Sequence, residues 1–222
     1  MQRACGNGDV FRNPDDCLFY TTAIARAFQD AGIATLAYCI LKSRVHFVLV
    51  PPRSDAIAYA LRVVHAAHAR HFNATTGLAG RVWQGRFCSC PLDSRHAPEA
   101  VRYVERLAVR EGFVTHASAY PWSSAAWRCG KAEENGPLPL APLPFSIGPP
   151  HAEWLMTEDA SLVRGIERCT RTGRPCGDPA FVHELEARLG RAFAPKKRGR
   201  PPKTKTSLGA DGPSRRDDWR VW

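Results

Sequence analysis

Two residues in this sequence are of types that take part in phosphoryl chemistry, a histidine on a predicted strand and a tyrosine on a predicted helix. His46 lies in the apolar run 45–50, and because side chains alternate along a strand, Arg44 and His46 point to one face. Tyr103 lies on a predicted helix with Arg106 and Arg110 on its side, three and seven residues further on. Guanidinium groups neutralise phosphate and could lower the pKa of the phenol, so this arrangement suits a phosphate-facing surface.

Each of these residues also has a plain structural explanation. A single histidine on a strand is more often a structural residue than a ligand, and an amphipathic tyrosine often lies half-buried with its hydroxyl in water. The spacing alone therefore leaves both interpretations open.

The elements that position these residues follow from hydrophobic periodicity and stop signals. The pattern predicts helices over 17–31, from Ser54 or Asp55 to about 72, and from Pro98 to about 111. It predicts strands over 33–41, 45–50 and 82–92, with a tight turn between the first two. The expected order is helix, strand, strand, helix, strand, helix.

This order predicts an α+β fold, a ferredoxin-like split βαβ sheet with helices on one face. Such a unit has the order βαββαβ, so the first strand is expected to be missing. Few residues precede Val10, and Gly6 to Gly8 make a poor strand. We interpret the gap as a truncated gene or a start codon assigned too late, which would deprive neighbouring strands of hydrogen-bond partners.

The chain divides by composition into a main domain and appended segments. We expect a folded domain over 1–130, a Pro-rich linker or peripheral wrap over 131–150, and a small helical segment over 151–190 with two short helices. The second of these should begin at Pro179, capped by Asp178, and stop at Gly190.

Residues 191–222 form a basic tail that carries +7 of the formal net charge of +10. With few apolar residues and many Pro and Gly, it is typical of a disordered arm that binds polyanions. The alternative is a tail that only improves solubility.

No apolar run in the sequence is long enough to cross a bilayer, and the first residues do not form a signal peptide. The eight cysteines are scattered, which favours reduced thiols in a cytoplasmic protein. Cys88 and Cys90 have no Cys-x-x-Cys pair or histidine cluster beside them, so the sequence does not favour a structural zinc site.

Several stretches together carry a family pattern. They occur in the order 37–51 (AYCILKSRVHFVLVP), 71–73 (HFN), 80–87 (GRVWQGRF), 102–110 (RYVERLAVR) and 120–124 (YPWSS), followed by the basic segments 170–175 and 196–201. Over residues 2–203 the chain resembles the single-tyrosine HUH transposases, the insertion sequence 200-like group with its REP-associated branch. Collinear motifs over this length are far more specific than any one of them.

The resemblance implies a metal-dependent enzyme that cleaves and rejoins single-stranded DNA at hairpin-bearing repeats. In the family, two histidines on one strand and a ligand from the catalytic helix hold a divalent cation, Mg²⁺ or Mn²⁺. A helical tyrosine attacks the phosphate and forms a 5′-phosphotyrosine link. By this resemblance His46 matches the second metal-binding histidine and Tyr103 matches the nucleophile.

Two departures from the family pattern affect the expected metal site. Where the family has Asn-His-Val-His, this chain has Ser43-Arg44-Val45-His46, and a guanidinium has no lone pair to donate. Four residues after Tyr103, where the family has asparagine, this chain has Leu107. We therefore expect a DNA-binding protein of the transposase family whose metal binding and strand cleavage are impaired.

Two alternatives remain open, an active REP-associated transposase and a ferredoxin-like nucleic-acid-binding module without transposase chemistry. The second of these lacks paired strand aromatics at the spacing that RNA-binding sheets use. The expected partner is single-stranded or hairpin DNA, and both a monomer and a homodimer are compatible with the sequence. The Arg198-Gly199-Arg200-Pro201 run also resembles an AT-hook. The residues expected to contact DNA are Arg44, Arg102, Arg106, Arg110, Arg171, Arg174, Lys196, Lys197, Arg198 and Arg200.

Overall fold

The computed structural model describes residues 1–131 and 138–194 and has a small antiparallel sheet with helices on both faces. The strands are β1 (Gln2–Arg3), β2 (Ala34–Leu41) and β3 (Arg44–Val50), in the spatial order β1-β3-β2. The helices are α1 (Pro14–Asp30), α2 (Ala56–Thr76), α3 (His96–Glu105), α4 (Leu107–Arg110), α5 (Ser124–Arg128), α6 (His151–Trp154), α7 (Ala160–Thr172) and α8 (Pro179–Leu189). Short 3₁₀ turns lie at Cys5–Asn7 and Ala117–Ala119. The α+β class is confirmed.

Capping residues set the ends of α1 and α8. The Asn13 side chain accepts a hydrogen bond from the Asp16 backbone N–H, and Pro14 opens α1. At α8 the Asp178 side chain accepts from the Phe181 N–H, and Gly190 ends the helix with φ of 58°. The predicted start and stop of α8 are therefore confirmed.

The expectation that the first strand is missing is wrong. Gln2 and Arg3 pair with Val45 and Arg44 of β3, and this two-residue strand takes the place beside β3. The sequence pattern missed it because two residues have no visible alternation, and only distant partners identify them as a strand.

The segment predicted as a strand over 82–92 forms isolated bridges instead of a regular strand. Its backbone nevertheless follows the first residues of the chain, since the Gln84 N–H donates to the Arg3 carbonyl at 2.9 Å and the Cys88 N–H to the Met1 carbonyl at 2.8 Å. Trp83 forms an antiparallel bridge with Ala4. The partner is too short to support a longer ladder, so the predicted strand is reduced to a few hydrogen bonds.

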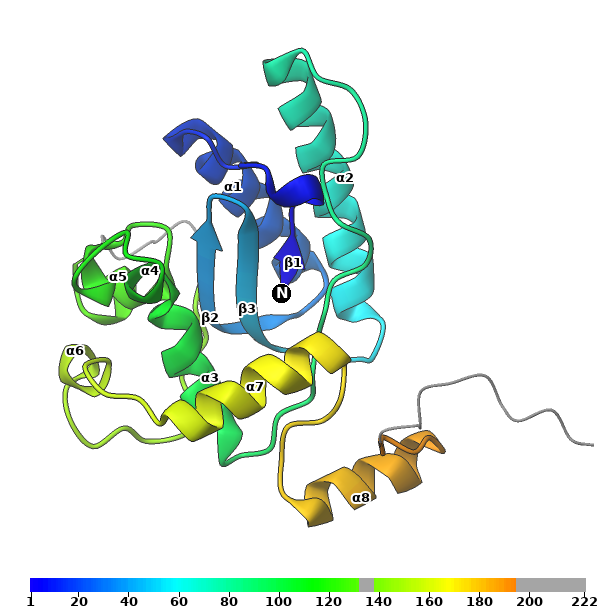
Figure 1. Cartoon of the computed structure of the whole chain (residues 1–222), viewed down its shortest axis with the longest axis vertical. Helices are drawn as coiled ribbons and strands as arrows, with labels where there is room; N and C mark the ends of the chain where they lie inside the picture. Colours follow the sequence, from blue (N-terminus) through cyan, green and yellow to red (C-terminus); the bar gives the residue numbers. More distant parts are fainter. Residues whose placement is uncertain (132–137, 195–222) are drawn as a thin grey trace, which may run out of the picture.

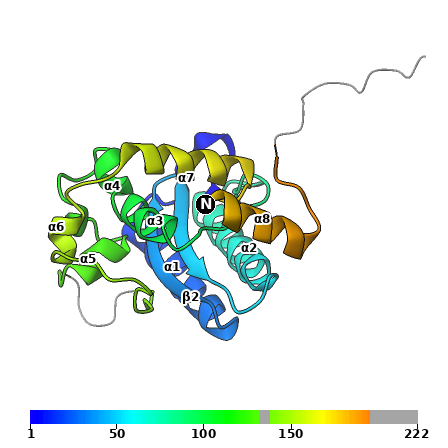
Figure 2. The same cartoon turned by 90° about the horizontal axis from the view of Figure 1, so that it is seen from below.

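Helices cover both faces of the sheet, which corrects the expectation of helices on one face only. Tyr38, Ile40 and Val45 pack with α1 and α2, whereas Cys39 and Val48 pack with α3, α4 and α7. In Figure 1, α7 lies in front of α3 near the lower ends of the strands and α1 lies behind the strands, and Figure 2 shows the helices on the two sides of the sheet from below. The strand pattern is therefore apolar on both sides, as expected for a sheet between two layers.

The predicted third helix is divided at Arg106, which separates α3 from α4. The described part of the predicted linker, residues 138–150, packs against the body of the protein. Leu138 is buried, and the Ala141 N–H donates to the Thr35 carbonyl at 2.9 Å. Residues 151–190 contain three helices where two were predicted. Among the described residues, no helix has the length and apolar character needed to span a membrane.

Candidate nucleic-acid site

Strand β3 places Arg44 and His46 on the face that α3 covers. His46 pairs across the sheet with Cys39 of β2 and is buried, with 6% of its surface exposed. Burial lowers the pKa of His46 well below its usual value, and the positive charges of the Met1 amine, Arg44 and Arg3 lower the pKa further. His46 is therefore neutral at physiological pH. Its Nε2 atom has no hydrogen-bond partner among the described residues.

Helix α3 brings Tyr103 to this histidine. The two rings meet edge to face, with centroids 6.1 Å apart and planes 68° apart. The Arg110 guanidinium lies 5.4 Å from the centre of the Tyr103 ring. Residues 57 positions apart thus form one cluster between the sheet and α3.

The environment of Tyr103 raises its pKa to about 12, contrary to the expectation that nearby arginines lower it. Burial is the largest cause, because it disfavours the phenolate. The Glu167 carboxylate of α7 adds to the effect through its negative charge and a hydrogen bond with the neutral hydroxyl. Arg110 and Arg44 act in the opposite direction but do not prevail.

Arg44 is held by a carboxylate from the end of α4. Its Nη2 atom lies 2.5 Å from Oε1 of Glu111, and both side chains are partly exposed. A phosphate group approaching Arg44 would therefore compete with Glu111. No local pattern points to Glu111 as the partner of Arg44, because the two residues are 67 positions apart.

The three arginines of the α3–α4 region are also engaged within the protein. Arg106 and Arg110 both pair with Glu158, at 3.2 and 3.3 Å. Arg102 pairs with Glu99 at 3.3 Å and donates to the Thr157 carbonyl at 3.1 Å. These contacts fasten the segment before α7 to α3, so each of the three side chains has a structural role.

The remaining basic residues expected to contact DNA lie elsewhere. Arg171 is exposed near the end of α7, and Arg174 follows the turn at Gly173. Neither guanidinium forms an ion pair with any residue in the ranges 1–131 and 138–194. Lys196, Lys197, Arg198 and Arg200 fall outside the described residues.

The residues around His46 do not fit the divalent ion that the family resemblance implies. The described parts of the chain hold no group of three His, Cys, Asp or Glu side chains placed to bind a metal. Arg44 is paired with Glu111, and Leu107 is 2% exposed in the core between the sheet and the helices. His46 alone supplies an imidazole here, and one ligand does not hold Mg²⁺ or Mn²⁺.

Sequence reasoning missed a buried polar cluster on the other side of α3. Glu105 is fully buried and contacts the Ser124 hydroxyl at 2.6 Å, His151 Nε2 at 2.6 Å and Arg128 Nε at 3.5 Å. The helical spacing could have indicated that Glu105 is buried, since this residue shares a helical face with Val101 and Ala108, which are both buried. A carboxylate at such a position requires partners, and it fixes α3 to α5 and α6.

Comparisons with known proteins add one solved structure. No protein-family model and no curated protein matches the chain. The chain is similar to a solved structure of a REP-associated tyrosine transposase bound to a REP hairpin, with a TM-score of 0.47 and 18% sequence identity. The similarity covers 67% of this chain and 87% of the other.

Proposed function

We propose that this chain is a DNA-binding protein of transposase type that binds single-stranded or hairpin repeat DNA and has lost most strand-cleaving activity. The observation that carries the proposal is the cluster of His46 and Tyr103 beside Arg44. A histidine and a tyrosine lie at the positions of the family motifs, whereas a guanidinium paired with Glu111 lies at the first metal-ligand position. This arrangement can attract a phosphate but lacks the ligands to hold a metal ion.

The state of Tyr103 agrees with the loss of cleavage. A tyrosine nucleophile must lose its proton as it attacks phosphorus, and an activated nucleophile has a nearby base or a lowered pKa. Tyr103 has a pKa of about 12 instead, since burial and Glu167 stabilise the neutral phenol. The neutral imidazole of His46 could accept a proton, but its ring contacts the ring of Tyr103 only edge to face.

Binding and cleavage can be tested in one experiment with purified protein. We expect a labelled hairpin oligonucleotide to shift in a native gel, with an affinity that falls as salt rises. With Mg²⁺ or Mn²⁺ present, we expect no covalent adduct that survives denaturing electrophoresis. Tyr103→Phe should bind like the parent protein. An adduct that disappears in Tyr103→Phe would refute impaired cleavage, and equal affinity for duplex, hairpin and RNA would refute the proposed DNA preference.

The alternative of an active transposase is favoured by one observation, the unsatisfied Nε2 atom of buried His46. Restoring the family ligands tests how far the site around His46 and Tyr103 is from activity. If only the ligands have been lost, Arg44→His with Leu107→Asn should gain metal-dependent nicking, and Tyr103→Phe in that background should abolish it. If the double variant does not nick DNA, the raised pKa of Tyr103 and the packing of α7 against this residue also prevent cleavage.

A further inference from the structure

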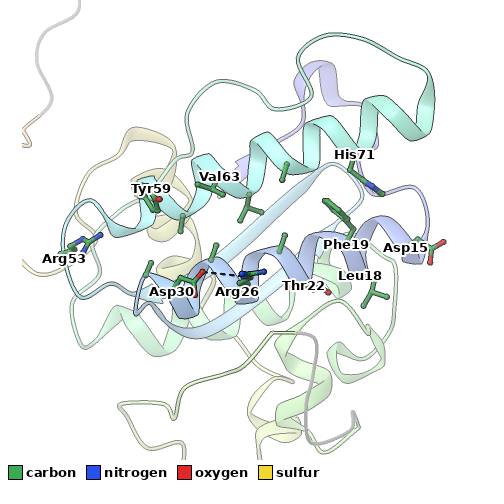
Figure 3. Close-up of a pocket in the computed structure, with 16 residues that line it drawn as sticks. Asp15, Leu18, Phe19, Thr22, Arg26, Asp30, Arg53, Tyr59, Val63 and His71 are labelled. Carbon is green, nitrogen blue, oxygen red and sulfur yellow. Dashed lines mark ion pairs between the residues drawn. The ribbon is translucent and has the colours of Figure 1, made fainter.

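A groove between α1 and α2 has no assigned role in the proposed function. It has a volume of about 950 Å³ and lies on the side of these helices away from the sheet. Figure 3 shows Tyr59, Val63 and His71 along α2, opposite Phe19 and other residues of α1.

The groove exposes large apolar side chains along its length. Leu18 is 54% exposed, Tyr59 56% and Val63 47%, and the Phe19 ring stacks on His71 with centroids 4.0 Å apart. The groove is hollow between the helices because the side chains there are small, among them Ala23, Ala27, Ala60 and Ala67. Single exposed apolar residues are common, but a contiguous apolar groove is characteristic of a surface that another segment covers.

Charges of both signs line the rim of this groove. Asp30 pairs with Arg26 at 4.0 Å, with both side chains largely exposed, and Asp15 and Arg53 also line the groove. A long exposed ion pair is weak, so Arg26 and Asp30 can exchange partners at low cost. The rim therefore suits an apolar segment flanked by both acidic and basic residues.

Residues 217–222 have this composition. Between Phe193 and Trp219 the chain has no aromatic residue. Residues 217–222 are Asp217, Asp218, Trp219, Arg220, Val221 and Trp222. Two tryptophans are unexpected in a segment that serves only solubility or phosphate binding. Each tryptophan buries about 150–250 Å² when it is covered, so docking in an apolar groove would be favourable.

The chain beyond the described residues is long enough to reach the groove. The structure describes the chain to residue 194, just after α8, and in both Figure 1 and Figure 2 α8 lies on the side of the molecule that holds the start of α2. Residues 195–222 can span up to about 90 Å when extended. A tethered segment has an effective concentration on the order of millimolar, which favours docking within one chain over docking of a second copy.

We propose that residues 217–222 dock in the groove between α1 and α2, with Trp219 and Trp222 covering Tyr59, Val63 and the small side chains between the two helices. Asp217 or Asp218 then faces Arg26 or Arg53 on the rim, and Arg220 faces Asp15 or Asp30.

Photo-crosslinking of the full-length protein tests this docking. With p-benzoylphenylalanine in place of Trp219, we expect a crosslinked species of monomer mass, with the adduct mapped by mass spectrometry to α1 or α2 at the groove. The same probe in place of Ser207 is the matched control, and it should not label the groove. Adducts outside the groove, or no adduct, would overturn the proposal, and adducts at dimer mass would assign the groove to a second copy instead.

A groove variant provides an independent readout. Val63 is half-exposed, so Val63→Glu should fold normally, which circular dichroism can verify, and it should reduce crosslinking from position 219 several-fold. Leu189→Glu, at the exposed end of α8, also replaces an exposed apolar residue with a carboxylate and should leave the yield unchanged. An unchanged yield in Val63→Glu would also overturn the proposal.

Discussion

The Glu105 carboxylate and the His151 imidazole are joined at 2.6 Å, although the two residues are 46 positions apart. The contact lies inside the protein, where Glu105 is fully buried and also bonds Ser124. It connects the helix that carries Tyr103 to the segment that leads to α7. The precise placement of Tyr103 against β3 therefore depends on a polar cluster that makes no contact with the candidate site.

Removing this carboxylate should strongly destabilise the protein. We expect Glu105→Ala to lower the free energy of unfolding by about 3–5 kcal/mol, because Arg128 and His151 would lose a buried partner. Urea denaturation followed by circular dichroism measures this change. Glu184→Ala removes the exposed pair with Arg188 and should cost no more than about 0.5 kcal/mol. Similar losses in the two variants would contradict the role of the buried cluster.

Two substitutions should move the pKa of Tyr103 in opposite directions. Glu167→Gln removes a negative charge that favours the neutral phenol, so the pKa should fall from about 12. Arg110→Ala removes a positive charge that favours the phenolate, so the pKa should rise. Titration by NMR of ¹³C-labelled tyrosine, with Tyr103→Phe to assign the signal, measures both shifts. A shift of the same sign in both variants would show that the two charges do not act directly on the hydroxyl.

Two histidines of α2 should make the protein less stable in mild acid. Burial lowers the pKa of His65 to about 3 and that of His68 to about 4. In the unfolded chain both titrate near pH 6.5, so below that pH the unfolded state binds protons that the folded state cannot. The stabilisation that these two neutral histidines provide is fully present above pH 6.5 and is lost as the pH falls toward 4 and 3.

The measurement is the urea midpoint between pH 7 and pH 4.5, a range in which most carboxylates stay ionised. The His68→Phe variant is the informative comparison, since His68 is fully buried and neither ring nitrogen has a hydrogen-bond partner among the described residues. Its stability should depend less on pH than that of the parent. An equal pH dependence in the two proteins would assign the acid sensitivity to other groups.

The basic tail should determine much of the salt dependence of DNA binding. Replacing Lys196, Lys197, Arg198 and Arg200 together with alanine should reduce the slope of log K against log salt by about 2.8–3.6, since each phosphate contact contributes about 0.7–0.9. Fluorescence anisotropy at several salt concentrations measures the slope. The double variant Arg171→Ala with Arg174→Ala tests in the same way whether the turn after α7 contacts phosphate. An unchanged slope in the fourfold variant would mean that the tail makes no phosphate contacts.

Elements with local signals could be predicted from the sequence. The cap at Asp178, the proline after it and Gly190 are sufficient to place α8. Runs of apolar, β-favouring residues bounded by turn residues are sufficient to place β2 and β3. The leading strand could not be predicted, because Gln2 and Arg3 become a strand only through pairing with β3. The regular strand over 82–92 was wrong for the same reason, as its conformation depends on that short partner.

In the candidate site too, contacts set by local pattern could be predicted from the sequence, and contacts between distant segments could not. Alternation along β3 places Arg44 beside His46, and the family resemblance selects Tyr103, which the structure does bring to His46. The carboxylates that decide the charge of the site come from elsewhere in the chain. Glu111 and Glu167 reach it from α4 and α7, and no local pattern predicts pairing between segments so far apart. The expected direction of the Tyr103 pKa shift was wrong because the sequence does not reveal burial.

The two-residue turn at Lys42 and Ser43 determines which chemistry β3 presents to each side of the sheet. Residues 44, 46 and 48 face α3, whereas residues 45, 47 and 49 face α1 and α2. Adding or deleting one residue at this turn would shift the strand by one position and exchange the two sets. Deleting one residue would bring Phe47 to Tyr103, and adding one would bring Val45 there. In both cases the imidazole would face α1 and α2. The length of a short surface loop, rather than the identity of any residue in it, thus preserves the histidine–tyrosine encounter.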